Sequence, residues 1–68
     1  QIGPKIRKLR ENKQWTQEQL VAHCHLIGWS ISRSTLAKME SKVRRITDIE
    51  VALIAKALSV PVKELFDI

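Results

Sequence analysis

The chain has 68 residues, of which 44% are hydrophobic, and its formal net charge is +5. A chain of this size supports one small hydrophobic core, so we expect a single domain over residues 1–68. Because the sequence starts with Gln in place of Met, we expect an excised or processed fragment. No apolar run approaches the roughly 18 residues of a membrane span, and no signal peptide is visible. These features exclude a membrane protein and favour a cytoplasmic one.

Patterns typical of catalysis and metal binding are missing from the sequence. It has no paired acids, no nucleophile with a base, no Gly-rich phosphate loop and no metal cluster, so we expect no enzyme, no cofactor and no small-molecule ligand. Cys24 is the one cysteine, and it lies between His23 and His25. We interpret Cys24 as a core hydrophobe and the two histidines as structural or solvated. A thiol without an internal disulfide partner fits a reducing compartment.

Positive charge is unevenly distributed along the chain. Residues 1–32 carry +3, residues 33–45 carry +4, and residues 46–68 carry −2. This concentration favours a polyanionic partner. An acidic protein or a membrane surface would also attract such a domain, so charge alone does not choose among these partners.

Two helices are predicted before residue 28. The first opens at Gly3 with Pro4 at its first position, carries Arg10 at the edge of its apolar face, and ends in a turn over residues 11–14. Trp15 then enters the core, and a capping box of Thr16 with Gln19 begins the second helix. This helix runs to residue 26 or 27 and ends before Gly28. The residues predicted to face inward are Ile2, Ile6, Leu9, Leu20, Val21, Cys24 and His25.

The third predicted helix spans about residues 32–41, with Ser32 as its N-cap. Ahead of it, Trp29 is expected to cover the core or, as the alternative, to make a partner-binding or dimer contact, and Ile31 is expected to pack inward. At 3.6 residues per turn Leu36 and Met39 face inward. The opposite side offers hydroxyls, small residues and one long cation without a carboxylate, and a DNA major groove about 12 Å wide admits such a helix. An ordinary amphipathic surface helix has the same pattern. The outward residues are Ser34, Ala37, Lys38 and Ser41.

A basic loop over residues 41–45 follows, in which Arg44 and Arg45 either contact phosphates or are solvated. A second capping box, Thr47 with Glu50, begins a strongly apolar fourth helix that ends at residues 59–60. Pro61 starts a short fifth helix. The chain shows no strand pattern, so the predicted fold class is all-α, a bundle of five helices. The inward-facing residues of the last two helices are Ile49, Leu53, Ile54, Ala57, Leu58, Val62, Leu65 and Phe66.

Five stretches in this order resemble the Xre family of helix-turn-helix domains, the phage Cro and lambda-repressor type. The resemblance implies a compact five-helix bundle whose second and third helices form the helix-turn-helix, with the third in the major groove. It further implies sequence-specific binding to double-stranded DNA by a repressor-like transcriptional regulator of bacterial or phage type, associated with the nucleoid. The matching stretches, which cover nearly the whole chain, are Ile6–Arg10, Trp15–Leu20, Ile31–Glu40, Ile54–Val60 and Glu64–Phe66.

The resemblance also assigns roles to individual residues. Bases would be read by Arg33, Ser34 and Lys38, with Thr35 as a mixed base or phosphate contact. Phosphates would be bound by Gln17, Ser41, Arg44 and Arg45. The family pairs an Arg of its first helix with the Glu that ends the recognition helix, which here are Arg10 and Glu40. Periodicity supports this structural ion pair independently, because both residues lie against apolar stripes and a buried charge needs a partner.

The chain departs from the family pattern at two places. The segment from Thr16 to Glu40 is longer than the family norm by about five residues, which fall around residues 25–30, and Lys42 stands where the family usually has Gly. Proteins of this type generally dimerise on DNA half-sites, so a homodimer is expected. Its surface would involve Val62, Phe66 or Ile68, or a segment outside this chain. The alternative function is a protein-interaction module, such as an antitoxin-like or coactivator domain of the same fold.

Overall fold

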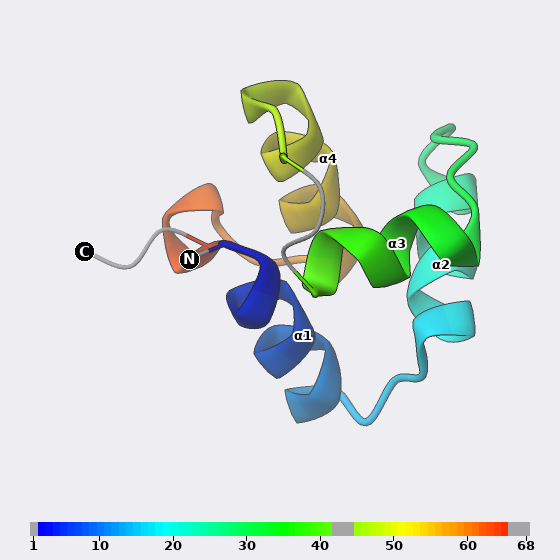
Figure 1. The fold of residues 1–68 in the computed structure, drawn as a ribbon, viewed down its shortest axis with the longest axis horizontal. Helices are drawn as coiled ribbons and strands as arrows, with labels where there is room; N and C mark the ends of the chain where they lie inside the picture. Colours follow the sequence, from blue (N-terminus) through cyan, green and yellow to red (C-terminus); the bar gives the residue numbers. More distant parts are fainter. Residues whose placement is uncertain (1, 42–44, 66–68) are drawn as a thin grey trace.

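The computed structural model describes residues 2–41 and 45–65. In these ranges the chain forms four α-helices and one short 3-10 helix and has no strand, so the predicted all-α class is confirmed. In Figure 1, α3 lies in front of the other helices, with one end beside α2 and the other beside α1. The elements are α1 (Ile2–Asn12), α2 (Gln17–Leu26), α3 (Arg33–Glu40), α4 (Asp48–Leu58) and η1 (Val62–Leu65).

Side-chain caps fix where three of the helices begin. Thr16 and Thr47 each accept a backbone N–H from the third helical residue, whose own side chain accepts the N–H of the cap, so both predicted capping boxes are confirmed. Ser32 Oγ accepts the N–H of Thr35 at 3.1 Å and caps α3 as predicted. Each box satisfies two backbone donors that a helix start leaves without partners.

Residues in the left-handed region end two of the helices. Gly28 has φ +88° just after α2, as predicted from its position, and Ser59 has φ +58° at the end of α4. Gln14, in the predicted turn after α1, also has a positive φ, of 62°. Each of these residues turns the chain sharply where a helix must stop.

The core lies where α1, α2, α3 and α4 meet. Leu36 and Met39 of α3 are fully buried, as predicted from the helical period, and Trp15 and Trp29 are half-buried against the same cluster. Because α3 contributes two of the largest core side chains, its orientation is fixed by packing and not by its ends alone. The buried apolar residues are Ile6, Leu20, Cys24, Ile31, Leu36, Met39, Val51, Ile54, Ala55, Ala57, Leu58 and Leu65.

Gly3 allows α1 and α3 to approach closely. A Cβ built on Gly3 would lie 2.4 Å from the carbonyl oxygen of Met39 and 3.1 Å from that of Glu40. Both atoms belong to the backbone and have no rotamer by which to move away. The contact therefore places the last turn of α3 against the first turn of α1.

Several predicted details are wrong. The predicted fifth helix is only the 3-10 helix η1, because its i→i+3 bond from Glu64 N–H to the Pro61 carbonyl closes a segment too short for an α-helix. Val62 in it is 42% exposed. Pro4 is the third residue of α1 and not the first, a shift of the size usual at helix ends.

The inward face predicted for the fourth helix also needs correction at Ile49, which is 74% exposed. The buried residues Val51, Ile54, Ala55 and Leu58 cluster on one side of α4. At about 100° per residue, Ile49 lies on the opposite side. His25, predicted to face inward from α2, is likewise exposed.

Candidate nucleic-acid interface

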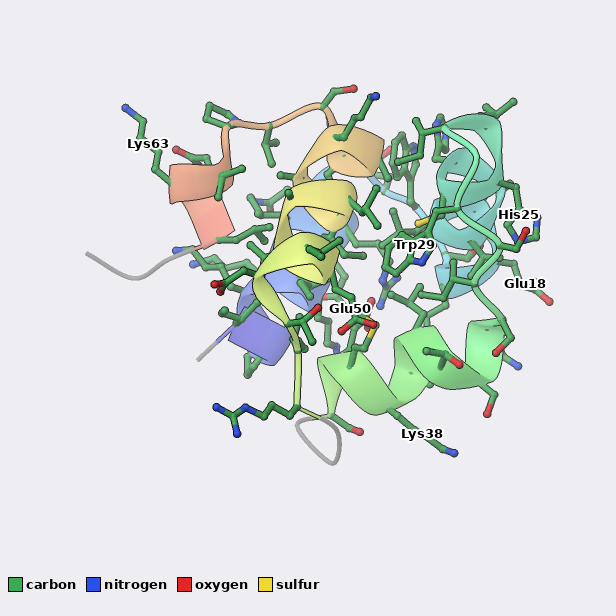
Figure 2. All side chains as sticks on the ribbon, turned by 90° about the horizontal axis from the view of Figure 1, so that it is seen from above. Glu18, His25, Trp29, Lys38, Glu50 and Lys63 are labelled. Atoms are coloured by element: carbon green, nitrogen blue, oxygen red, sulfur yellow. The ribbon has the colours of Figure 1, made fainter. Side chains whose placement is uncertain are left out.

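The outer side of α3 is exposed at three of the four positions predicted from its period, Ser34, Lys38 and Ser41, whereas Ala37 is half-buried. Arg33 is also exposed, while Leu36 and Met39 hold the opposite side against α1 and α2. Figure 2 shows α3 at one face of the molecule, with Lys38 pointing away from the other helices. This side presents two cations and two hydroxyls on a rigid support.

Thr35 differs from these residues in being half-buried. Its hydroxyl accepts a hydrogen bond from Ser32 Oγ at 3.0 Å, so it shares in the cap of α3. A hydroxyl in this position retains a donor that can turn toward a ligand. The structure therefore places Thr35 at the margin of the exposed side.

The first turn of α3 contains Arg33 and no acidic residue. The first turn of α1 likewise has no acid, whereas that of α2 contains Glu18 and that of α4 contains Asp48 and Glu50. The positive end of the helix dipole favours carboxylates at the start of a helix and disfavours cations. Arg33 and the backbone N–H groups therefore make this end of α3 attractive to an anion from outside.

The predicted Arg10–Glu40 ion pair is formed, and both residues are buried, with 8% and 6% exposure. Arg10 Nε donates to Glu40 Oε2 at 2.8 Å and Arg10 Nη2 donates to Glu40 Oε1 at 3.1 Å, a bidentate arrangement. Arg10 Nη1 also donates to the Trp15 carbonyl at 2.6 Å. The pair thus joins α1, the turn before α2 and the last residue of α3.

Gln17 lies at the start of α2 but its side chain is not directed to solvent alone. It is half-buried, and its Nε2 donates to Glu40 Oε1 at 3.2 Å. The amide therefore orients the same carboxylate that binds Arg10. The backbone N–H of Gln17 belongs to the helix start, where such groups have no partner within the helix.

An open hollow of about 260 Å³ lies between α1, the start of α2 and the end of α3. It brings together Gln17 and Ser41, two of the predicted phosphate contacts, and adds Arg7, which sequence reasoning missed as a candidate. Arg7 is exposed and pairs with Glu11 at 3.1 Å. The sequence did contain one indication that Arg7 lies near this site, because Arg7 lies one turn before Arg10 on the same helix. The hollow is lined by Arg7, Arg10, Gln17, Ala37, Glu40 and Ser41.

Four other predicted positions are not among the residues that line the hollow. Arg44, like Phe66 and Ile68 of the expected dimer surface, lies outside the described residues. Arg45 is exposed in the segment before α4. Among the described residues, the structure groups the predicted positions Gln17 and Ser41.

The residues around Cys24 have structural contacts. Cys24 is fully buried, and burial raises the pKa of its thiol to about 11. The His23 ring stacks on Trp15 at a centroid distance of 4.0 Å, and His25 Nε2 lies 2.8 Å from the Ile31 carbonyl oxygen. Over residues 2–41 and 45–65, no three His, Cys, Asp or Glu residues group as a metal site.

Comparison with known proteins gives one match. A family model described as helix-turn-helix matches residues 6–65, which include all four α-helices apart from the first residues of α1. No curated protein and no solved structure matches the chain significantly. Within the described parts of the chain, every helix is too short or too polar to cross a membrane.

Proposed function

The chain belongs to the helix-turn-helix family, of the Xre and Cro type, and from this membership we propose that it binds double-stranded DNA sequence-specifically as a repressor-like transcriptional regulator. The family is one of DNA-binding regulatory domains and not of enzymes. In this proposal α2 and α3 form the helix-turn-helix, and α3 enters the major groove.

The observation that carries the proposal is the exposed side of α3. Its 8 residues form a helix whose diameter of about 10–12 Å fits a major groove about 12 Å wide. Arg33, Ser34 and Lys38 are exposed there without a carboxylate to repel DNA, and the buried Leu36 and Met39 keep that side turned outward. A helix held in this way can bring donors to base edges without rearranging the domain.

We assign base reading to the start and middle of α3. The guanidinium of Arg33 can donate two hydrogen bonds to O6 and N7 of a guanine, the commonest specific contact in the major groove. Ser34 and Lys38 would contact neighbouring bases. Thr35, at the margin, would contact a base or a phosphate with the hydroxyl hydrogen that its cap contact leaves available.

Phosphate binding is assigned to the hollow beside α3 and to the basic loop. The backbone N–H of Gln17 would donate to a phosphate oxygen while its side chain stays on Glu40. Ser41 and Arg7 would contact the same phosphate from α3 and α1, and Arg7 would exchange its exposed pairing with Glu11 for the phosphate. Arg44 and Arg45 would bind the backbone farther along.

One domain with a single short reading helix contacts few base pairs, so we propose that two copies bind a palindromic site. Their recognition helices would then lie about one helical turn, roughly 34 Å, apart on the DNA. This arrangement predicts two half-sites related by a dyad.

Selection of bound duplexes from a random pool tests the proposal. We expect enrichment of a short palindromic motif, and binding that weakens steeply as salt is raised, because each phosphate contact releases counterions. No enrichment together with weak salt dependence would contradict DNA binding and favour the protein-interaction module.

A further inference from the structure

The connection between α2 and α3 is six residues long, from Ile27 to Ser32, yet it is held at several points. The N–H groups of Ile27 and Trp29 both donate to the Cys24 carbonyl, at 3.2 and 3.0 Å, and that of Gly28 donates to the His25 carbonyl at 3.0 Å. These bonds fix the first half of the connection to the last turn of α2.

Two apolar side chains hold the connection against the core. Trp29 is half-buried, and Ile31 is 5% exposed and part of the buried cluster. Figure 2 shows Trp29 turned inward from the connection. Neither side chain fixes the direction of the backbone that leads into Ser32, because apolar packing is not directional.

A directional contact is supplied by His25, which Figure 2 shows on the outer flank of α2 beside the connection. Its Nε2 lies 2.8 Å from the carbonyl oxygen of Ile31, the residue immediately before the Ser32 cap. A carbonyl oxygen only accepts, so Nε2 carries the proton and donates. The contact spans six residues of sequence and closes the connection into a loop with α2.

The two ends of α3 are therefore held by different hydrogen bonds. Its last residue, Glu40, is bound by Arg10 and Gln17. Its start depends on the backbone before Ser32, where His25 makes the side-chain hydrogen bond to Ile31. Arg33 and Ser34 follow directly, so a small tilt of this end would move their side chains more than that of Lys38.

We propose that His25 is a positioning residue for base recognition, which sets the direction of the start of α3 through its hydrogen bond to the Ile31 carbonyl. The inference deepens the proposed function and rests on it. His25 itself needs to touch no base. Its effect should be confined to base pairs read by the first turn of α3, because the Arg10–Glu40 end stays in place.

The test compares variants on duplexes that carry the selected motif. The base pair assigned to Arg33 is the one whose preference Arg33→Ala removes. For each variant, the dissociation constants for the motif and for a duplex altered at that pair give a discrimination ratio. We expect His25→Ala to lower this ratio on the order of tenfold while leaving the salt slope unchanged. His25→Gln, whose amide can donate from a similar position, should restore most of it.

His23→Ala is the matched control, because it removes the neighbouring imidazole and its stacking on Trp15 without touching the connection. It should lower the melting temperature and leave the discrimination ratio unchanged. If His25→Ala does not fold, His25→Leu is used in its place, because leucine keeps the bulk of the side chain without the hydrogen-bond donor.

An unchanged ratio in the His25 variant, or an equal loss at every base pair of the motif, would overturn the inference while the proposed function stands. A wild-type chain that enriches no motif would overturn both.

Discussion

The buried pair of Arg10 and Glu40 permits a quantitative test of how α3 is held. Among the described residues, Arg10→Met leaves the buried Glu40 carboxylate with the Gln17 amide as its remaining hydrogen-bond donor, and it also removes the donor to the Trp15 carbonyl. Among the described residues, Glu40→Leu leaves the buried guanidinium with the Trp15 carbonyl as its remaining hydrogen-bond acceptor. The double variant removes both charges at once.

The magnitude follows from the burial of the pair. Removing one partner of a buried ion pair costs about 3–5 kcal/mol, because the remaining charge stays desolvated. A domain of 68 residues is stable by only about 3–10 kcal/mol, so each single variant should lose a large share of its free energy of unfolding. The double variant should cost less than the sum of the two.

Urea unfolding followed by circular dichroism measures these free energies for all four proteins. We expect the double variant to be at least about 2 kcal/mol more stable than the sum of the single effects predicts. Effects that add within about 0.5 kcal/mol would refute the reasoning, because the two charges would then not depend on each other. Arg7→Met is the matched control, since its pair with Glu11 is exposed and should contribute at most about 0.5 kcal/mol.

Three further predictions concern DNA recognition, the thiol and a helix contact. Arg33→Ala should relax preference at one base pair and cost about 1–3 kcal/mol, whereas Arg44→Ala should weaken all sequences equally and reduce the salt slope by about one, as binding titrations at several salt concentrations will show. Since the pKa of Cys24 is 9.0 in the unfolded chain and about 11 when buried, stability should fall as pH rises through that window. Cys24→Ala should lack this part of the fall in urea titrations from pH 8 to 11. Gly3→Ala should cost about 1–3 kcal/mol in thermal unfolding, because its Cβ meets the Met39 carbonyl oxygen. Gly28→Ala is its control. The cost there, about 1 kcal/mol, should come from φ +88° alone, since a Cβ added at Gly28 would meet no atom of the described residues within 4 Å beyond its chain neighbours.

Local chemistry explains why much of the fold could be predicted. The capping boxes at Thr16 and Thr47 and the Ser32 cap each join residues three positions apart. Both partners can therefore be recognised from their spacing in the sequence. The burial of Leu36 and Met39 follows from the helical period in the same way. These features placed α3 and its exposed side correctly before any tertiary contact was known.

Contacts between distant segments explain most of what could not be predicted. The hydrogen bond from Gln17 to Glu40 spans 23 positions, and the close approach of Gly3 to the Met39 carbonyl depends on how two helices cross. Apolar character alone also misled the prediction at Ile49, which lies on the far side of α4. The Arg10–Glu40 pair was the exception, because the family resemblance implied it and the position of both residues against apolar stripes supported it.

The first turn of α3 has a consequence for the unbound protein. A carboxylate among residues 33–35 would stabilise the free helix by about 0.3–1 kcal/mol, and the sequence has none there. The domain thus forgoes this gain when alone, and under our proposal a nucleic acid provides the negative potential in its place. Amide hydrogen exchange in this turn should consequently slow on binding by more than in α4, which already has its own acids.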